Sequence, residues 1–475
     1  MNKLLTIKDI LNLPKKDYHN FFVNYFNAPL ADIFRILGLD DMDIQSAKGS
    51  YIYLRNKKKI LDTTSGIGVL ALGHNHPKIL NIEKKSISSD LIDIQKFGIN
   101  KFQAALAYNL SLLLPDPLNT SFFTVSGAEA IEAGIKLITR VQPNFKNKFI
   151  TFYGDYHGKT HGSLSVTDSE NFKHGFHMSI PDSQILKIPH GDIKAFKKAI
   201  FDNSLPGGKN SIAAVIIEPI QGQTLFVPYK DFLNDLSTEC KKHNILLFID
   251  EIKCGMGRTG SLFSFMEQGI VPDVLAISKA MGGGKRAIGA MVTSSKLSKK
   301  AYGQKNTCSI HSSTFGGIGT SCLVAIETLN IISKKSFLNS VNKKGDYFKD
   351  KLERLIKKHP NILEKVNGKG LFLGLILKPN LSKKFLQSIN KNLSKNIDVI
   401  ITGSILSNLY KKHNILIHFT PPRPDMLVFM PPLIITYKQI DDVIKALDIT
   451  FSDGINKLIL RFINQNLIDY FKKSY

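Results

Sequence analysis

Short apolar runs separated by longer stretches of mixed polarity are the main pattern along this chain. The runs are rich in Val, Ile, Leu and Phe, and they fall at residues 149–152, 213–217, 246–249, 274–277 and 290–292. Runs of this length that end in polar or glycine residues predict buried β-strands. Because helical stretches separate them, the strands are expected to form one mostly parallel sheet with right-handed crossovers and helices on both faces. The predicted fold class is α/β.

Other parts of the chain show different patterns. The alternation of polar and apolar residues over residues 49–61 is typical of a β-hairpin. The remaining predicted elements are amphipathic helical pieces in residues 1–50, helices over 106–114 and 320–332, strands over 371–377 and 426–436, and an amphipathic helical tail of no evident role over 451–475.

The length of 475 residues is enough for one large domain with smaller attachments. From about residue 334 the pattern changes to that of a smaller α+β domain. We therefore predict an N-terminal segment of helices and a hairpin over residues 1–75 that packs with the small domain, a large domain over 76–333, and a small α+β domain with a helical tail over 334–475.

Charge and cysteine content narrow the classes of function. The net charge of +24 would ordinarily indicate a nucleic acid or an anionic membrane as partner. Most of this charge comes from lysines in short clusters, which are typical of solvated surfaces, so a polyanion site is only the second interpretation. The four cysteines lack metal-binding spacing, no apolar run reaches transmembrane length, and the first residues show no targeting pattern. We expect a reduced cytoplasmic enzyme without a metal, a nucleic-acid partner or a membrane partner.

Two of the predicted strands end in reactive side chains. Residues 246–249 lead into Asp250 and Glu251, and residues 274–277 lead into Ser278 and Lys279. In open α/β sheets, ligands bind in the crevice at such strand ends. A lysine that forms a Schiff base and a carboxylate that keeps a pyridine nitrogen protonated are what pyridoxal phosphate chemistry requires. Taken singly, each residue is better interpreted as a solvated strand end or a charged loop.

A second motif is a strand, a small-residue turn and a helix start within residues 121–137. The turn is Ser126-Gly127-Ala128, and acidic residues follow in the first helical turn. Unpaired N–H groups and the helix dipole at such a start favour a phosphate. The same turn is also the commonest ordinary connection from strand to helix. It becomes informative together with Asp250 and Lys279.

Two further strand ends carry candidate site residues. The strand over 149–152 leads into Tyr156 and His157, and the strand over 213–217 leads into Glu218. An aromatic ring at a strand end can cover one face of a flat cofactor. Ordinary core packing is a comparably good interpretation of Tyr156 alone.

These segments together resemble a known family, the class III pyridoxal-phosphate-dependent aminotransferases, which include ornithine, acetylornithine and ω-amine transaminases. The resemblance runs along most of the chain and includes residues 63–77, TTSGIGVLALGHNHP, which are similar to the family's SGxxxxxLGHxHP stretch. His74 and His76 in that stretch are interpreted as loop-packing residues rather than metal ligands.

The resemblance implies a fold-type-I pyridoxal-phosphate-dependent transferase and gives roles to individual residues. Lys279 would be the Schiff-base lysine, Asp250 the partner of the pyridine nitrogen, and Ile252 the apolar residue against one face of the ring. The full set of candidate cofactor-binding residues is Ser126, Gly127, Ala128, Tyr156, His157, Glu218, Asp250, Ile252, Lys253, Lys279 and Thr314. Among these, Gly127 and Ala128 would bind the phosphate. Thr314 would reach the phosphate of the neighbouring subunit's cofactor, which implies a homodimer with shared active sites.

The chain also departs from the family pattern. Many members have an arginine and a glutamate where this sequence has Val428 and Gln223. Losing both charges together can be nearly neutral, whereas losing one would leave a buried unpaired charge at a cost of about 3–5 kcal/mol. We therefore expect that Val428 and Gln223 do not bind a substrate carboxylate through charge. Lys253 replaces a glutamine that hydrogen-bonds the phenolic oxygen of the cofactor, and Lys159, where some members have arginine, is a weak substrate-contact candidate.

The resulting hypothesis is an aminotransferase that works by a two-stage, ping-pong exchange. It would move an amino group from an amine or amino acid, with a terminal amine favoured, to an oxo-acid or aldehyde. An epimerase or aminomutase with the same cofactor is the alternative, because it begins with the same proton removal. A non-catalytic dimeric binding protein is a third hypothesis, and the presence of both Lys279 and Asp250 argues against it.

Overall fold

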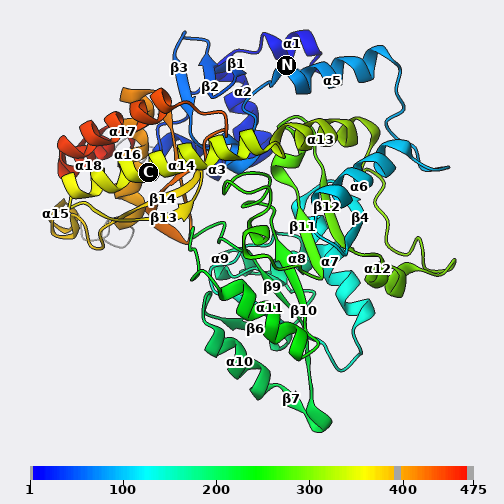
Figure 1. Cartoon of the computed structure of the whole chain (residues 1–475). Coiled ribbons are helices and arrows are strands. Elements are labelled where there is room, and N and C mark those ends of the chain that lie inside the picture. The colour runs from blue at the N-terminus through cyan, green and yellow to red at the C-terminus, as the bar shows by residue number, and fades with distance from the viewer. Residues whose placement is uncertain (1–3, 390–396, 468–475) are drawn as a thin grey trace.

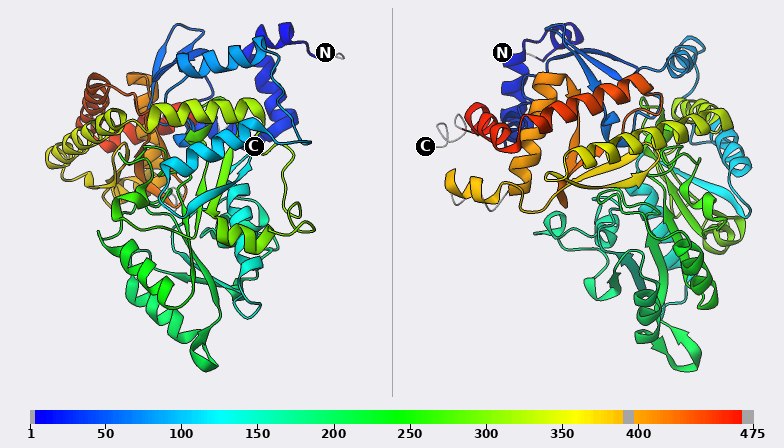
Figure 2. Two further views of the ribbon diagram at one scale, coloured as in Figure 1. Left: turned by 45° about the vertical axis from the view of Figure 1, so that its right-hand side comes forward. Right: turned by 60° about the vertical axis from the view of Figure 1, so that its left-hand side comes forward.

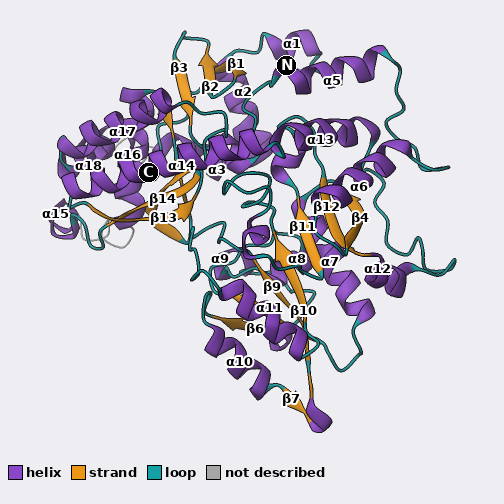
Figure 3. Ribbon diagram, in the orientation of Figure 1, coloured by secondary structure: helices purple, strands orange, loops and turns teal. Residues whose placement is uncertain are grey.

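A large sheet with helices on both of its faces forms the body of the molecule, and smaller sheets lie beside it (Figure 1). The computed structural model describes residues 4–389 and 397–467. Figure 3 shows that helices surround the strands of the large sheet, while the two four-stranded sheets lie among the N-terminal and C-terminal helices. The predicted α/β class is confirmed.

The large sheet has seven strands in the order β4-β12-β11-β10-β9-β5-β6. Four of its six pairings are parallel, and β12 is the one strand that runs antiparallel to both of its neighbours. The predicted mostly parallel sheet is therefore confirmed. In sheet order, the strands are β4 (Leu118–Thr124), β12 (Gly289–Ser294), β11 (Val274–Ile277), β10 (Leu246–Asp250), β9 (Ile212–Ile217), β5 (Lys148–Phe152) and β6 (Ile185–Ile188).

The central strands are apolar throughout because both of their faces are buried. On β10, Phe248 belongs to the apolar cluster under helix α7 (Gly127–Val141), and Ile249 belongs to the cluster on the opposite face. Helix and sheet approach closely at Gly134 of α7, where a Cβ atom would lie 2.4 Å from the ring of Phe248. The two clusters hold the strand ends in a fixed arrangement.

Other helices complete the two layers. The main ones are α5 (Pro77–Ser88), α6 (Lys101–Leu113), α10 (Ile193–Asp202), α11 (Phe232–Lys242), α12 (Ser295–Tyr302) and α13 (Gly319–Ile332). The helices predicted over residues 106–114 and 320–332 correspond to α6 and α13.

A four-stranded sheet with the order β13-β14-β17-β16 forms the core of the C-terminal part. The strands are β13 (Leu363–Lys369), β14 (Phe372–Leu377), β17 (Arg423–Phe429) and β16 (His418–Thr420), and the helices beside them are α14 (Lys335–Lys358), α16 (Ile397–His413) and α17 (Tyr437–Ser452). The prediction of a strand over residues 426–436 is wrong in its second half. β17 ends at Phe429 because Pro431 and Pro432 have no N–H group with which to continue the ladder.

The N-terminal hairpin is confirmed, and it forms a sheet with a distant part of the chain. β2 (Tyr51–Leu54) and β3 (Lys59–Asp62) pair with β1 (Ile44–Lys48) on one side and with β15 (Ile415–Leu416) on the other. The side chain of Tyr410 packs in the same small cluster as those of the hairpin. Figure 2 shows the N-terminal elements close to the C-terminal helices. The boundaries of the three predicted domains stay a prediction.

Both ends of the described chain are helical. The N-terminal helices are α1 (Ile7–Leu11), α2 (Lys15–Phe22) and α3 (Ala28–Ile36), and the predicted tail contains α18 (Ile455–Phe462), which packs on α16. Residues 468–475 of the tail prediction lie outside the described residues. Among the residues that are described, no helix has the length and apolar character needed to cross a membrane.

Candidate active site

A cavity of about 730 Å³ lies where the carboxyl ends of the central strands meet two segments from distant parts of the chain. The strand ends contribute most of the residues predicted for the site. Those that line the cavity are Gly127, Ala128, Tyr156, His157, Glu218, Asp250, Ile252, Lys253 and Lys279. The N-terminal segment contributes Gly66 and Ile67, and the C-terminal segment contributes residues 418–421, which include strand β16.

Asp250 is the last residue of β10, and its carboxylate is held from two directions. One oxygen, Oδ2, lies 2.9 Å from Nδ1 of His157, and the other accepts a 2.9 Å hydrogen bond from the backbone N–H of Ile252. The residue is only 2% exposed. The two contacts fix the orientation of the carboxylate at the floor of the cavity.

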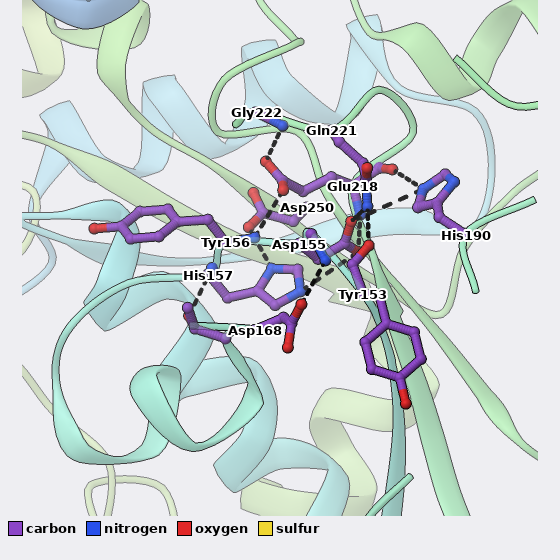
Figure 4. Close-up of polar contacts among 12 residues, drawn as sticks. Tyr153, Asp155, Tyr156, His157, Asp168, His190, Glu218, Gln221, Gly222 and Asp250 are labelled. Carbon is purple, nitrogen blue, oxygen red and sulfur yellow. Dashed lines mark hydrogen bonds and ion pairs between the residues drawn. The ribbon is translucent and has the colours of Figure 1, made fainter. Parts of the chain in front are cut away.

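His157 lies between two carboxylates. Its Nδ1 faces Asp250, and its Nε2 is 3.8 Å from Oδ2 of Asp155 (Figure 4). Burial opposes protonation of the ring, but the hydrogen bond with Asp250 and the negative charges of Asp250 and Asp155 outweigh it and raise the pKa of His157. The raised pKa favours the protonated form of His157, which pairs with the carboxylate of Asp250.

Asp155 is a member of this cluster that sequence reasoning missed. It is fully buried, and it accepts hydrogen bonds from the Gln221 side chain (2.7 Å) and from the backbone N–H of Glu218 (3.2 Å). Burial raises the pKa of the Asp155 carboxyl, although His190 and His157 oppose the change. The signal was a carboxylate two residues before His157 at the end of β5, but the sequence does not show that its side chain turns inward.

Glu218 follows β9, and its hydrogen bonds link the segment after β9 to the segment after β5. Its two carboxyl oxygens accept hydrogen bonds from the backbone N–H groups of Tyr156 (2.8 Å) and Gly222 (3.0 Å). Burial and the charges of Asp155 and Asp250 raise the pKa of Glu218 to about 8. Most of the Glu218 population is therefore protonated at neutral pH, which reduces the repulsion among the three carboxyl groups.

Lys279 follows β11 after one intervening residue, Ser278. Its backbone has a φ of 42°, in the left-handed region that non-glycine residues seldom adopt. Burial lowers the pKa of the Lys279 amino group, although the carboxyl groups of Asp250 and Glu218 oppose the change. A lowered pKa increases the neutral fraction of the amine, which is the nucleophilic form.

Lys253 brings a second amine to the cavity. Burial and the charge of Lys279 lower its pKa to about 7. Its Nζ donates a hydrogen bond to the carbonyl oxygen of Gly222. This contact turns the ammonium of Lys253 toward the protein backbone.

The predicted phosphate turn is the start of helix α7. Ser126 is the N-cap, and its Oγ accepts a 3.2 Å hydrogen bond from the N–H of Glu129. Gly127 and Ala128 come next and line the cavity, so the free N–H groups of the first helical turn lie at its edge. Gly127 also allows close approach of Ile252, because a Cβ atom at position 127 would lie 2.8 Å from the Ile252 side chain.

Several predicted residues lie apart from the cavity or have other contacts. Thr314 is exposed in the loop before α13 and does not line the cavity of its own chain. Val428 is fully buried in an apolar cluster, whereas Gln223 lines the cavity. His74 has the predicted loop-packing role, since its Nε2 lies 2.8 Å from Oδ2 of Asp62. Within residues 4–389 and 397–467, no group of three or more His, Cys, Asp or Glu residues is arranged to hold a metal.

Comparison with known proteins identifies the family of this chain. Residues 38–451 match the family described as "Aminotransferase class-III". The chain belongs to the class III aminotransferases. It is therefore an enzyme of this type, and the cofactor of the family is pyridoxal 5′-phosphate.

Individual relatives of this class III aminotransferase agree with the assignment. The chain is 34% identical to the acetylornithine aminotransferase of Methanocaldococcus jannaschii over 425 residues, which cover 88% of this chain and 96% of the relative. Its fold is similar to that of the ornithine aminotransferase of Toxoplasma gondii, with a TM-score of 0.77, 23% identity, and coverage of 95% and 99% of the two chains. It is also similar to an (S)-enantioselective ω-transaminase of Thermomicrobium roseum, with a TM-score of 0.78, 22% identity, and coverage of 95% and 99%.

The cavity of this class III aminotransferase fits pyridoxal phosphate. It contains a buried amine of lowered pKa, a carboxylate held in a fixed orientation, and a helix start without side chains that would obstruct an anion. The site should not tolerate a larger residue at position 127, because the absence of a side chain on Gly127 leaves the space that Ile252 occupies.

Gly127→Ala is expected to weaken cofactor retention by about tenfold, because the new methyl group displaces Ile252 by a few tenths of an ångström and obstructs the helix start. Dialysis of the purified protein followed by cofactor quantification measures the effect. The double variant Gly127→Ala with Ile252→Val, which makes room for the methyl group, should recover part of the loss. Unchanged retention in Gly127→Ala would contradict the assignment of this helix start to the phosphate.

Proposed function

We propose that this enzyme moves an amino group from a terminal amine, such as that of an ω-amino acid or a diamine, to an oxo-acid or aldehyde in a ping-pong reaction. One observation carries this proposal. The buried amine of Lys279 and the oriented carboxylate of Asp250 stand at neighbouring strand ends and face the same cavity.

The residues of the cavity would hold the cofactor in the following way. Lys279 would form the covalent bond with its aldehyde, and Asp250 would pair with its pyridine nitrogen. Ile252 and Tyr156 would hold the ring, and the N–H groups of Gly127 and Ala128 would bind the phosphate. His157, Glu218 and Lys253 line the cavity beside these groups, and Ser126 caps the helix that begins with Gly127.

The reaction requires a proton to move between two carbon atoms. Pyridoxal phosphate, when bound, supplies a cationic ring that withdraws electrons from the carbon that bears the amine. The Nζ atom of Lys279 would act as the acid/base that takes the proton from that carbon and later returns it. Asp250 would keep the pyridine nitrogen protonated, and His157 keeps Asp250 in place.

The assembly and location of the enzyme are further parts of the proposal. Thr314 lies on an exposed loop, as expected for a residue that reaches the cofactor phosphate of a partner subunit in a homodimer. All four cysteines are free thiols, as expected for a cytoplasmic protein.

The proposal is tested by mixing the cofactor-loaded enzyme with a panel of amines and amino acids. A donor should convert the lysine-bound form of the cofactor to its pyridoxamine form, and an oxo-acid or aldehyde should reverse the spectral change. The epimerase or aminomutase alternative would be favoured if a single enantiomer of an amine is racemised or rearranged without any acceptor. A purified dimer that takes up no cofactor would instead support the binding-protein hypothesis.

2-Oxoglutarate is expected to bind weakly, with a Kd of about 1 mM or higher, because Val428 and Gln223 provide no charged grip for its carboxylate. The measurement is a titration of the pyridoxamine form of the enzyme with 2-oxoglutarate. Micromolar binding would contradict this expectation. If such binding disappears in Lys159→Ala, the substrate carboxylate is bound by Lys159, which lines the same cavity.

A further inference from the structure

Two polar side chains at the cavity wall have atoms that no described residue pairs with. His418 has both ring nitrogens buried without a hydrogen-bond partner among the residues that the structure describes. The same holds for Oε1 of Gln223, a residue that is 8% exposed. Both residues line the cavity. Buried polar atoms in native proteins nearly always have partners, so unpaired atoms on residues that line a ligand cavity point to the ligand as their partner.

The fold brings these two residues together from distant parts of the sequence. His418 begins β16 and pairs in register with Val428 of β17. Thr420, on the same short strand, donates a 2.7 Å hydrogen bond from its Oγ1 to the backbone carbonyl of Gln223. β16 therefore fixes His418 and Gln223 relative to each other. Gln223 is itself one of the two positions at which many family members have a charged residue, and His418 pairs with Val428, which is the other.

The wall formed by His418 and Gln223 is polar but uncharged. Burial and the positive charges of Lys253 and Lys279 outweigh the opposing charge of Asp62 and lower the pKa of His418 to about 3. The imidazole is therefore neutral at physiological pH, with one nitrogen that donates and one that accepts. A substrate carboxylate at this wall would lose hydration without gaining a counter-charge from either residue.

The lysines of the cavity already have other contacts. Lys253 donates to the carbonyl of Gly222, and the Nζ of Lys159 lies 3.8 Å above the centre of the Phe172 ring. Lys279 is assigned to the cofactor. Recognition at the wall therefore depends on hydrogen bonds from neutral groups.

We propose that His418 and Gln223 bind an uncharged carboxamide group of the substrate and select it over a carboxylate. The three unpartnered atoms comprise two acceptors and one donor, and a primary carboxamide has the complementary set of two N–H donors and one carbonyl acceptor. This assignment rests on the proposed function of the same cavity, since it names the class of substrate that the aminotransferase accepts.

The test uses two matched pairs of probes on the cofactor-loaded enzyme. Pentanamide and pentanoate, which cannot react, report binding by calorimetry. 5-Aminopentanamide and 5-aminopentanoate, which have the same chain and terminal amine, report the spectral half-reaction. We expect each carboxamide to be preferred over its carboxylate by about tenfold or more, as either a Kd ratio or a ratio of second-order rate constants.

Variants of the wall should remove this preference. His418→Phe keeps a ring of similar size but loses both nitrogens, and it should weaken pentanamide binding by about tenfold while changing pentanoate binding by less than about twofold. Gln223→Leu should have the same effect and carries the test if the first variant fails to fold. The matched control is His413→Phe, because the Nε2 of His413 is also buried without a described partner but the residue lies outside this cavity, at the end of α16. It should leave both Kd values unchanged.

The outcomes separate this inference from the proposed function. Equal affinity for pentanamide and pentanoate in the unmodified enzyme, or an unchanged ratio in both His418→Phe and Gln223→Leu, would overturn the inference even if amines are converted normally. A failure of every amine to change the cofactor spectrum would overturn the proposed function, and the binding of the unreactive probes would still decide the role of His418 and Gln223.

Discussion

Lys279→Ala is expected to reduce turnover by about 10⁴-fold or more and to abolish the visible absorbance of the lysine-bound cofactor. The reason is that one amino group has two duties, since it bonds the cofactor and moves the proton, and a positioned acid/base alone contributes about 10²–10⁴-fold. Burial lowers the pKa of this amine, which increases the fraction in the neutral, nucleophilic form. Borohydride reduction followed by peptide mass spectrometry should find the cofactor on residue 279 of the unmodified enzyme.

The second cavity lysine provides the control for this experiment. Lys253 also has a lowered pKa, but its Nζ is bonded to the carbonyl of Gly222. Lys253→Met should therefore keep the covalent attachment at Lys279, whatever its effect on rate. The assignment is wrong if the reduced adduct appears on Lys253, or if Lys279→Ala keeps its activity with an unchanged melting temperature.

The sequence predicted the strand ends well because each central strand is buried on both faces. Such strands are apolar throughout, so the first polar residue after them marks the edge of the sheet. Asp250 ends β10 and Glu218 directly follows β9, whereas Lys279 is the second polar residue after β11, behind Ser278. Since parallel strands end at the same edge, the meeting of these side chains in one cavity could be predicted without a structure.

The parts that could not be predicted depend on long-range pairing. His418 enters the cavity because β16 pairs with β17, and Gln223 joins it through a hydrogen bond from a residue 197 positions away. The hairpin of residues 49–61 gives no sign that its second strand pairs with β15. Register between segments so far apart is decided by packing, which a local pattern does not contain.

The position of Asp155 was unpredictable for a different reason. Residues 153–160 form an irregular loop, and hydrophobic periodicity says nothing about which way a loop side chain turns. In the structure, Asp155 turns inward and meets His157, so that two carboxylates flank one imidazole. Short-range sequence order therefore identified the segment but not the arrangement of its charges.

Asp250→Asn is expected to slow the spectral half-reaction by about 10²–10⁴-fold and to weaken cofactor retention, because it removes the negative charge that keeps the pyridine nitrogen protonated. The amide keeps the shape of the carboxylate, so a purely structural role would predict little change. An NMR titration gives an independent readout: the pKa of His157, raised by Asp250 despite burial, should fall in the variant. In the unmodified protein, stability from this raised pKa is fully present below about pH 6.5 and is lost as the pH rises through the folded-state value.

Asp155→Asn is the matched control for Asp250→Asn, since the carboxylate of Asp155 also faces His157, at 3.8 Å. This variant should lower the pKa of His157 less and leave cofactor retention unchanged. Equal effects of the two variants on the half-reaction would show that the site needs the total negative charge rather than the carboxylate of Asp250.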